Sequence, residues 1–125
     1  MVINNGLPIK YRWSGWKQLL NTQTISNNRW NQLLEHQNET VSHIVNADVP
    51  RTFPTNPFFQ KKSGEVDIGR ELLYKVCFAI GNYFTTVGYT QGLNFIAGYL
   101  LQVSGGYAIQ AFSVLKDMLI DDRFC

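Results

Sequence analysis

The chain has 125 residues, of which 45% are hydrophobic and 14% aromatic, so it is too apolar to be disordered and long enough to bury one core. Eleven basic residues against nine acidic ones give a net charge of +2, and the longest basic run is the pair Lys61 and Lys62. This balance excludes the electrostatic footprint of a nucleic-acid-binding protein or of a protein that binds an acidic membrane directly.

Cysteine usage and the first residues bear on the cellular compartment. Cys77 and Cys125 are far apart and show no paired spacing, which is typical of a reducing compartment rather than of a disulfide scaffold. Cys77 falls on an apolar helical face, which indicates an inert core thiol. The chain begins without the basic and apolar regions of a secretory signal, and no stretch reaches the length of a membrane span. We therefore expect a cytoplasmic protein.

The first half of the chain predicts helices followed by a stiff loop. Pro8 suits the first turn of a helix, and apolar residues recur near helical spacing up to residue 20. One or two further helices are predicted over 26–46. Residues 48–62 contain Pro50, Pro54 and Pro57, which cannot continue a helix and favour extended backbone for the residue before each proline.

The second half contains the most regular helical pattern. Apolar residues over 72–84 recur one helical turn apart, with Asp67 as the candidate N-cap. This helix is predicted to stop near Gly88, and the next begins around Gly92. Gly105-Gly106 ends that one, and a last amphipathic helix covers 108–119. No alternating strand pattern of useful length appears, so the fold class is all-α, a multi-helix, bundle-like array.

Ordinary catalytic and metal motifs are missing from the sequence. It contains no nucleophile elbow, no zinc-protease HExxH and no P-loop with its lysine. His36 and His43, with Glu35 and Glu39, could suggest a metal cluster, but their polar helical region favours a solvated face. We therefore predict no metal site.

A first polar segment, with the sequence DVPRTFP over 48–54, stands out beside a predicted helix. Prolines flank Arg51 and remove backbone freedom, so the loop presents the guanidinium at a lower entropy cost than a flexible loop would. The alternative is an Arg51–Asp48 pair that only ties down the loop. Spacing alone favours this alternative.

A second polar segment, YTQGLN over 89–94, lies where a helix begins. Gln91 precedes the predicted helix, and Gly92 leaves space for a ligand or another backbone to come close. The alternative is that Gln91 merely caps the turn.

The two segments, in this order, resemble the paired signature of the TBC domain, the Rab GTPase-activating family. A lone DxxR would be weak, but DVPRTFP followed by VGYTQGLNFIAG is specific. The likeness covers nearly the whole chain. Residues similar to other parts of the family pattern are Gly6-Leu7-Pro8, Arg12, Trp16, Leu19-Leu20 and Glu71-Leu72-Leu73-Tyr74.

This resemblance implies a helical protein that accelerates GTP hydrolysis by a Rab-family small GTPase, with Arg51 as arginine finger and Gln91 as glutamine finger. The supporting or partner-binding residues that it implies are Asp48, Thr52, Tyr89, Gly92 and Asn94. GTP and Mg²⁺ would belong to the partner GTPase, so the chain itself would need no cofactor. Membrane contact would be indirect, through a lipidated GTPase at the periphery of endomembranes.

The chain resembles the N-terminal portion of that domain, so we expect 1–125 to be a single partial TBC domain that lacks the C-terminal helices. Such a fragment would expose apolar faces around Phe112, Leu115 and Leu119, and would self-associate through its last helix. Two alternatives to a GTPase activator stay open. One is a Rab-binding module without catalytic activity, and the other is a helical scaffold with no GTPase partner.

Overall fold

The structure is a computed structural model that describes residues 23–59, 68–85 and 89–120. These ranges form helices and turns and contain no strand, so the all-α prediction is confirmed. The elements are α2 (Asn27–Glu35), α3 (Glu39–Asp48), η1 (Val49–Arg51), η2 (Pro57–Phe59), α4 (Ile68–Tyr83), α5 (Leu93–Val103) and α6 (Ala108–Ile120), where η marks a single turn of 3-10 helix. The predicted opening helix and the Asp67 cap lie outside the described residues, and α4 ends at Tyr83, earlier than the predicted stop near Gly88.

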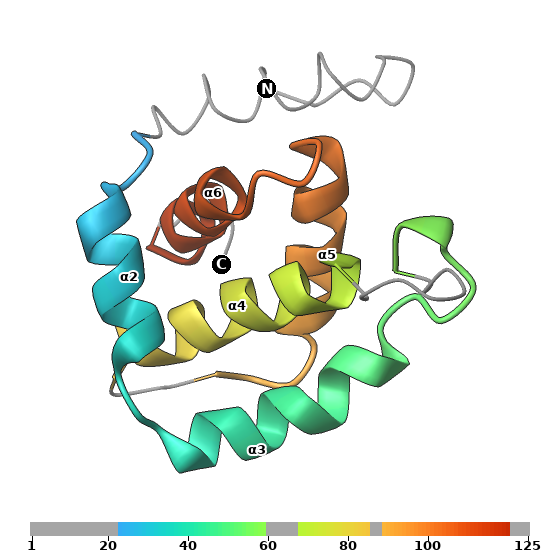
Figure 1. Ribbon diagram of the computed structural model, residues 1–125, viewed down its shortest axis with the longest axis horizontal. Helices are drawn as coiled ribbons and strands as arrows, with labels where there is room; N and C mark the ends of the chain where they lie inside the picture. The colour runs from blue at the N-terminus through green and yellow to red at the C-terminus, as the bar shows by residue number, and fades with distance from the viewer. Residues whose placement is uncertain (1–22, 60–67, 86–88, 121–125) are drawn as a thin grey trace.

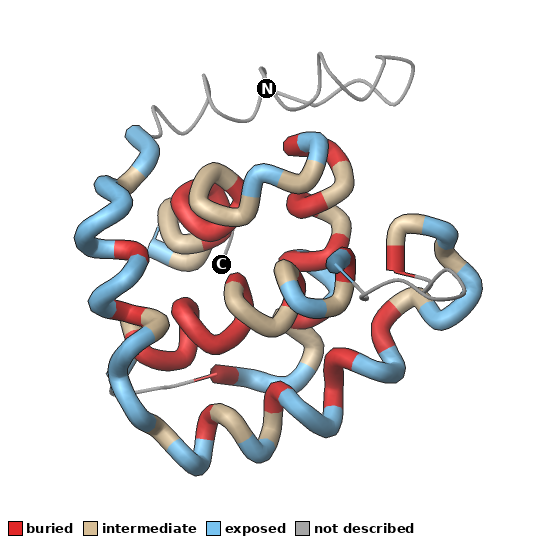
Figure 2. The backbone as a smooth tube through the Cα atoms, viewed as in Figure 1, coloured by how far each residue is buried: buried red, intermediate tan, exposed pale blue. Residues whose placement is uncertain are grey.

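α4 is the central helix, because it packs against α2, α3, α5 and α6 (Figure 1). Residues 76–82 are all buried, so neighbours cover this part of the helix on every side (Figure 2). α3 and α5 both lie against α4, and the polar segments predicted from the sequence stand at the end of α3 and before the start of α5. None of the described helices is long and apolar enough to cross a membrane.

α6 completes the core with the side chains that the sequence analysis placed on an exposed face. Phe112 and Leu115 are fully buried, and the Phe112 ring lies 5.5 Å from Trp30 and 6.0 Å from Tyr83, measured between centroids. Leu119 is partly buried. Because α6 packs against both α4 and α5, the predicted exposed face is wrong for these residues. The structure therefore gives no support to self-association through this face.

α3 runs directly into η1, which changes the geometry expected for the first polar segment. Val49 stays helical (φ −58°, ψ −47°) although Pro50 follows it, so the predicted extended backbone is wrong at this position. Pro50 stands in the first turn of η1, where its missing N–H has no partner to lose. The Thr52 N–H then donates to the Val49 carbonyl at 3.1 Å. Asp48 and Arg51 consequently lie one helical turn apart.

Candidate functional site

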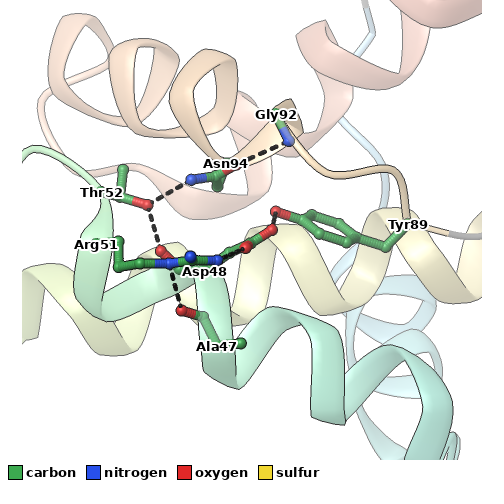
Figure 3. A network of polar contacts seen from close by, with 7 residues as sticks. All are labelled: Ala47, Asp48, Arg51, Thr52, Tyr89, Gly92 and Asn94. Carbon is green, nitrogen blue, oxygen red and sulfur yellow. Dashed lines mark hydrogen bonds and ion pairs between the residues drawn. The ribbon is translucent and has the colours of Figure 1, made fainter.

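Arg51 ends η1 with its guanidinium folded back along α3 (Figure 3). Nη2 donates to Asp48 Oδ1 at 2.7 Å, and Nε donates to the Ala47 carbonyl at 3.1 Å. The pair that spacing favoured therefore forms. The Arg51 side chain is nevertheless 65% exposed, whereas that of Asp48 is 4% exposed. Water can solvate the exposed guanidinium when it leaves Asp48, whereas the buried Asp48 carboxylate then loses its ion pair and keeps the hydrogen bond from Tyr89.

The second segment turns at Gly92, whose φ of 103° lies in the left-handed region that favours glycine. The Gly92 N–H donates to Asn94 Oδ1 at 3.1 Å, and the Leu93 N–H donates to the Thr90 carbonyl at 3.1 Å. α5 begins immediately after this turn, which confirms the helix start predicted around Gly92. The turn leaves Thr90 and Gln91 exposed.

Two buried hydrogen bonds join the segments across 41 and 42 residues of sequence. The Tyr89 hydroxyl donates to Asp48 Oδ2 at 2.9 Å, and Asn94 Nδ2 donates to Thr52 Oγ1 at 2.7 Å. The Thr52 hydroxyl donates in turn to the Asp48 carbonyl at 2.9 Å, and all four residues are buried. Arg51 and Gly92 are bonded to this buried group through Asp48 and Asn94. We call the six residues together the coupling network: Asp48, Arg51, Thr52, Tyr89, Gly92 and Asn94 (Figure 3).

The coupling network contains all but one of the site residues named from the sequence. The exception, Gln91, belongs to the same turn, between Tyr89 and Gly92. Among the described residues none hydrogen-bonds to the Gln91 side chain. Asn94 caps the turn, so the alternative in which Gln91 does so is wrong.

This arrangement suits a ligand that arrives from outside the chain. It presents a planar, permanently charged guanidinium and a neutral carboxamide on two segments that buried hydrogen bonds hold together. A guanidinium stabilises charge on phosphoryl oxygens, and an amide can orient a water molecule. Within 23–59, 68–85 and 89–120, no group of three or more His, Cys, Asp or Glu could hold a metal ion.

Residues 9–125 match the family model described as the Rab-GTPase-TBC domain. The chain belongs to this family. It is 33% identical over 106 residues to growth hormone-regulated TBC protein 1 of Homo sapiens, covering 82% of this chain and 31% of that protein. It is also 33% identical over 122 residues to Rab GTPase-activating protein eat-17 of Caenorhabditis elegans, covering 98% of this chain and 13% of that protein. The TBC chain thus spans less than a third of the length of either relative.

Burial of Tyr89 and Cys77 sets the protonation of the groups behind the site of this TBC chain. Burial raises the pKa of Cys77 to about 12, so the thiol is protonated and inert, as the sequence indicates. Burial also raises the pKa of Tyr89 well above its usual value, and the neighbouring Cys77 and the Asp48 carboxylate add to this shift. The Tyr89 hydroxyl therefore keeps its proton and donates a hydrogen bond to Asp48.

We expect Tyr89→Phe to lower the free energy of unfolding by about 1.5–3 kcal/mol, because it removes a hydrogen bond to a buried carboxylate without changing the ring. Urea unfolding at pH 7 measures the difference. The matched control is Tyr107→Phe, at a side chain that is 64% exposed, where we expect a change within about 0.5 kcal/mol. Equal midpoints for the two variants would contradict a stabilising Tyr89–Asp48 bond.

The raised pKa of Tyr89 adds a pH dependence with a definite sign. A tyrosine in the unfolded chain ionises at about pH 10. The stabilisation that comes from keeping Tyr89 neutral is therefore complete below about pH 10 and is lost progressively as the pH rises above that value. Tyr89→Phe removes this contribution, so its stability should fall less steeply at high pH, by up to about 1.4 kcal/mol per pH unit.

Arg70, in the first turn of α4, contacts the first polar segment, and the sequence did not predict this contact. Its Nη1 donates to the carbonyls of Val49 and Thr52. No sequence signal could have found it, because the apolar spacing of α4 predicts a helix but says nothing about which segment its first turn meets.

Proposed function

We propose that this chain accelerates the hydrolysis of GTP bound to a Rab-family small GTPase, with Arg51 and Gln91 supplied in trans. One observation carries the proposal: the coupling network fastens the two segments together and leaves both of these side chains exposed. Family membership supports it, as does the name of the Caenorhabditis elegans relative, a Rab GTPase-activating protein.

In the proposed mechanism Arg51 acts on the transferring phosphoryl group. Its guanidinium exchanges Asp48 for phosphate oxygens, where its charge matches the charge that develops during transfer. The Asp48 carboxylate keeps its bond to Tyr89 and therefore continues to hold the end of α3 against the second segment. The Arg51 side chain is already largely in water, so the cost of the exchange lies mainly in leaving the buried Asp48 carboxylate without its ion pair.

Gln91 takes the second role, with a carboxamide that can donate and accept hydrogen bonds. It would orient the attacking water, while the Gly92 turn sets the direction in which its side chain leaves the backbone. GTP and Mg²⁺ belong to the partner in this mechanism. The chain would meet membranes at the periphery of endomembranes, only through the lipidated GTPase, and would otherwise work in the cytoplasm.

Single-turnover GTP hydrolysis by a panel of GTP-loaded Rab proteins tests the proposal. We expect the wild-type chain to accelerate hydrolysis by at least one of them, and the double variant Arg51→Ala/Gln91→Ala to leave the rate at its intrinsic value. Binding to a Rab without acceleration would favour the non-catalytic binding module. Failure to bind any Rab, even one loaded with a transition-state mimic, would favour the helical scaffold.

A further inference from the structure

α4 contributes one charged side chain to the turn that carries Arg51. Arg70 Nη1 donates to the Thr52 carbonyl at 3.1 Å and also to the Val49 carbonyl. Val49 begins η1 and Thr52 is its C-cap, so a single nitrogen bridges the start and the end of the turn. The Val49 carbonyl also accepts the Thr52 N–H that closes the turn. Arg70 is therefore bonded to the backbone on both sides of Arg51.

The surroundings of Arg70 hold its guanidinium in one place. Its central carbon lies 5.9 Å from the centroid of the Phe59 ring, and Phe59 is fully buried. The η2 turn can approach α4 this closely because Gly69 has no side chain; a Cβ there would collide with the Phe58 carbonyl. A planar guanidinium confined by two carbonyls and a ring face has little freedom to reorient.

The backbone that follows the turn needs such a restraint. Phe53 has a φ of 46°, a conformation that side chains with a Cβ adopt rarely, and it comes directly after the Thr52 carbonyl that Arg70 binds. The hydrogen bond from Arg70 holds the Thr52 carbonyl in place, so the strain at Phe53 cannot be relieved by a change in the backbone of η1.

We propose that Arg70 is a positioning residue, which acts through the backbone of η1 and fixes the direction in which Arg51 leaves the turn. This inference rests on the proposed function. Arg70 is only partly exposed and donates to the chain's own carbonyls, so its loss should misplace Arg51 without removing a contact to the GTPase. The effect should therefore appear in the maximal stimulated rate and not in the concentration of the chain that gives half of that rate.

The test compares Arg70→Met and Arg70→Lys with the wild-type chain on a Rab that the wild type activates. We expect Arg70→Met to lower the maximal rate about 10- to 100-fold, since a displacement of about 1 Å can cost about 10²-fold in rate. Half-saturation should stay within about twofold of wild type. Arg70→Lys should recover part of the rate, because one ammonium group can donate to both carbonyls, as Nη1 does.

Arg29→Met is the matched control. Arg29 likewise lies 5.9 Å from an aromatic centroid, that of Tyr83, but it belongs to α2 and not to the Arg51 turn. This variant should keep both the maximal rate and half-saturation of the wild type. A lower rate for Arg29→Met equal to that of Arg70→Met would overturn the positioning role in favour of a general loss of stability.

The remaining outcomes separate the proposed GTPase-activating function from the positioning role of Arg70. A wild-type chain that activates no Rab contradicts the proposed function itself. An active wild type with an equally active Arg70→Met overturns the positioning role alone, and so does a variant whose half-saturation rises at an unchanged maximal rate. If Arg70→Met unfolds below the assay temperature, Arg70→Lys decides: a reduced maximal rate with a wild-type unfolding temperature supports the role, and full activity overturns it.

Discussion

Arg51→Ala should lower the stimulated rate of GTP hydrolysis by about 10³–10⁵-fold, the range that an arginine finger contributes in related reactions. This corresponds to roughly 4–7 kcal/mol of the activation barrier. Arg51→Lys should recover little, because an ammonium is a point charge, whereas the planar guanidinium can bind two phosphate oxygens at once. Single-turnover hydrolysis at a saturating concentration of each variant measures the loss.

The same two variants should remain folded. Arg51→Ala leaves the buried Asp48 carboxylate without its ion pair but with its hydrogen bond from Tyr89, so we expect the free energy of unfolding to fall by about 1–3 kcal/mol. Urea unfolding provides this control. An Arg51→Ala chain that is folded and still activates the GTPase at the wild-type rate would show that the exposed guanidinium does no more than tie down its loop.

Gln91→Ala should lower the maximal stimulated rate by about 10²–10³-fold, the cost of removing one oriented hydrogen-bonding group from a transition state. Half-saturation should change little, because Gln91 orients water and is not proposed to anchor the partner. Stability should also be unaffected, because the side chain is exposed. Stopped-flow phosphate release over a range of chain concentrations separates the two kinetic parameters.

Thr90→Ala is the matched control for Gln91. Thr90 is the adjacent exposed residue in the same turn, and its carbonyl, which accepts the Leu93 N–H, is retained in the variant. We expect nearly wild-type activation from Thr90→Ala. Equal losses from the two variants would indicate that the turn itself, and not the Gln91 carboxamide, matters for activation.

The helices could be predicted from local spacing wherever apolar residues recur with a helical period. α4, α5 and α6 follow this pattern, and the left-handed Gly92 marks the start of α5. The same reasoning failed at Val49, because the steric preference before Pro50 is weaker than the hydrogen bonds that close η1 onto the Val49 carbonyl. It also failed for Phe112, because an amphipathic pattern does not reveal which neighbours cover a helix face.

The candidate site shows a similar division. The residue types of its two segments, including the Arg51–Asp48 spacing, can be recognised along the chain, since they depend on short-range geometry. The bonds from Tyr89 to Asp48 and from Asn94 to Thr52 cannot, because each depends on α3 and α5 packing against α4. The contact of Arg70 with both ends of η1 depends on the same packing.

The amino-acid order by itself determined the helical class of the described residues, the approximate bounds of α5 and α6 and the family to which the chain belongs, because all three depend on local periodicity and on short motifs. Only the tertiary structure decided that two segments more than 40 residues apart share buried hydrogen bonds, that the apolar face of α6 is covered, and that Arg70 reaches the turn of Arg51. Such contacts depend on how helices pack around α4, and packing is a property of all the elements together.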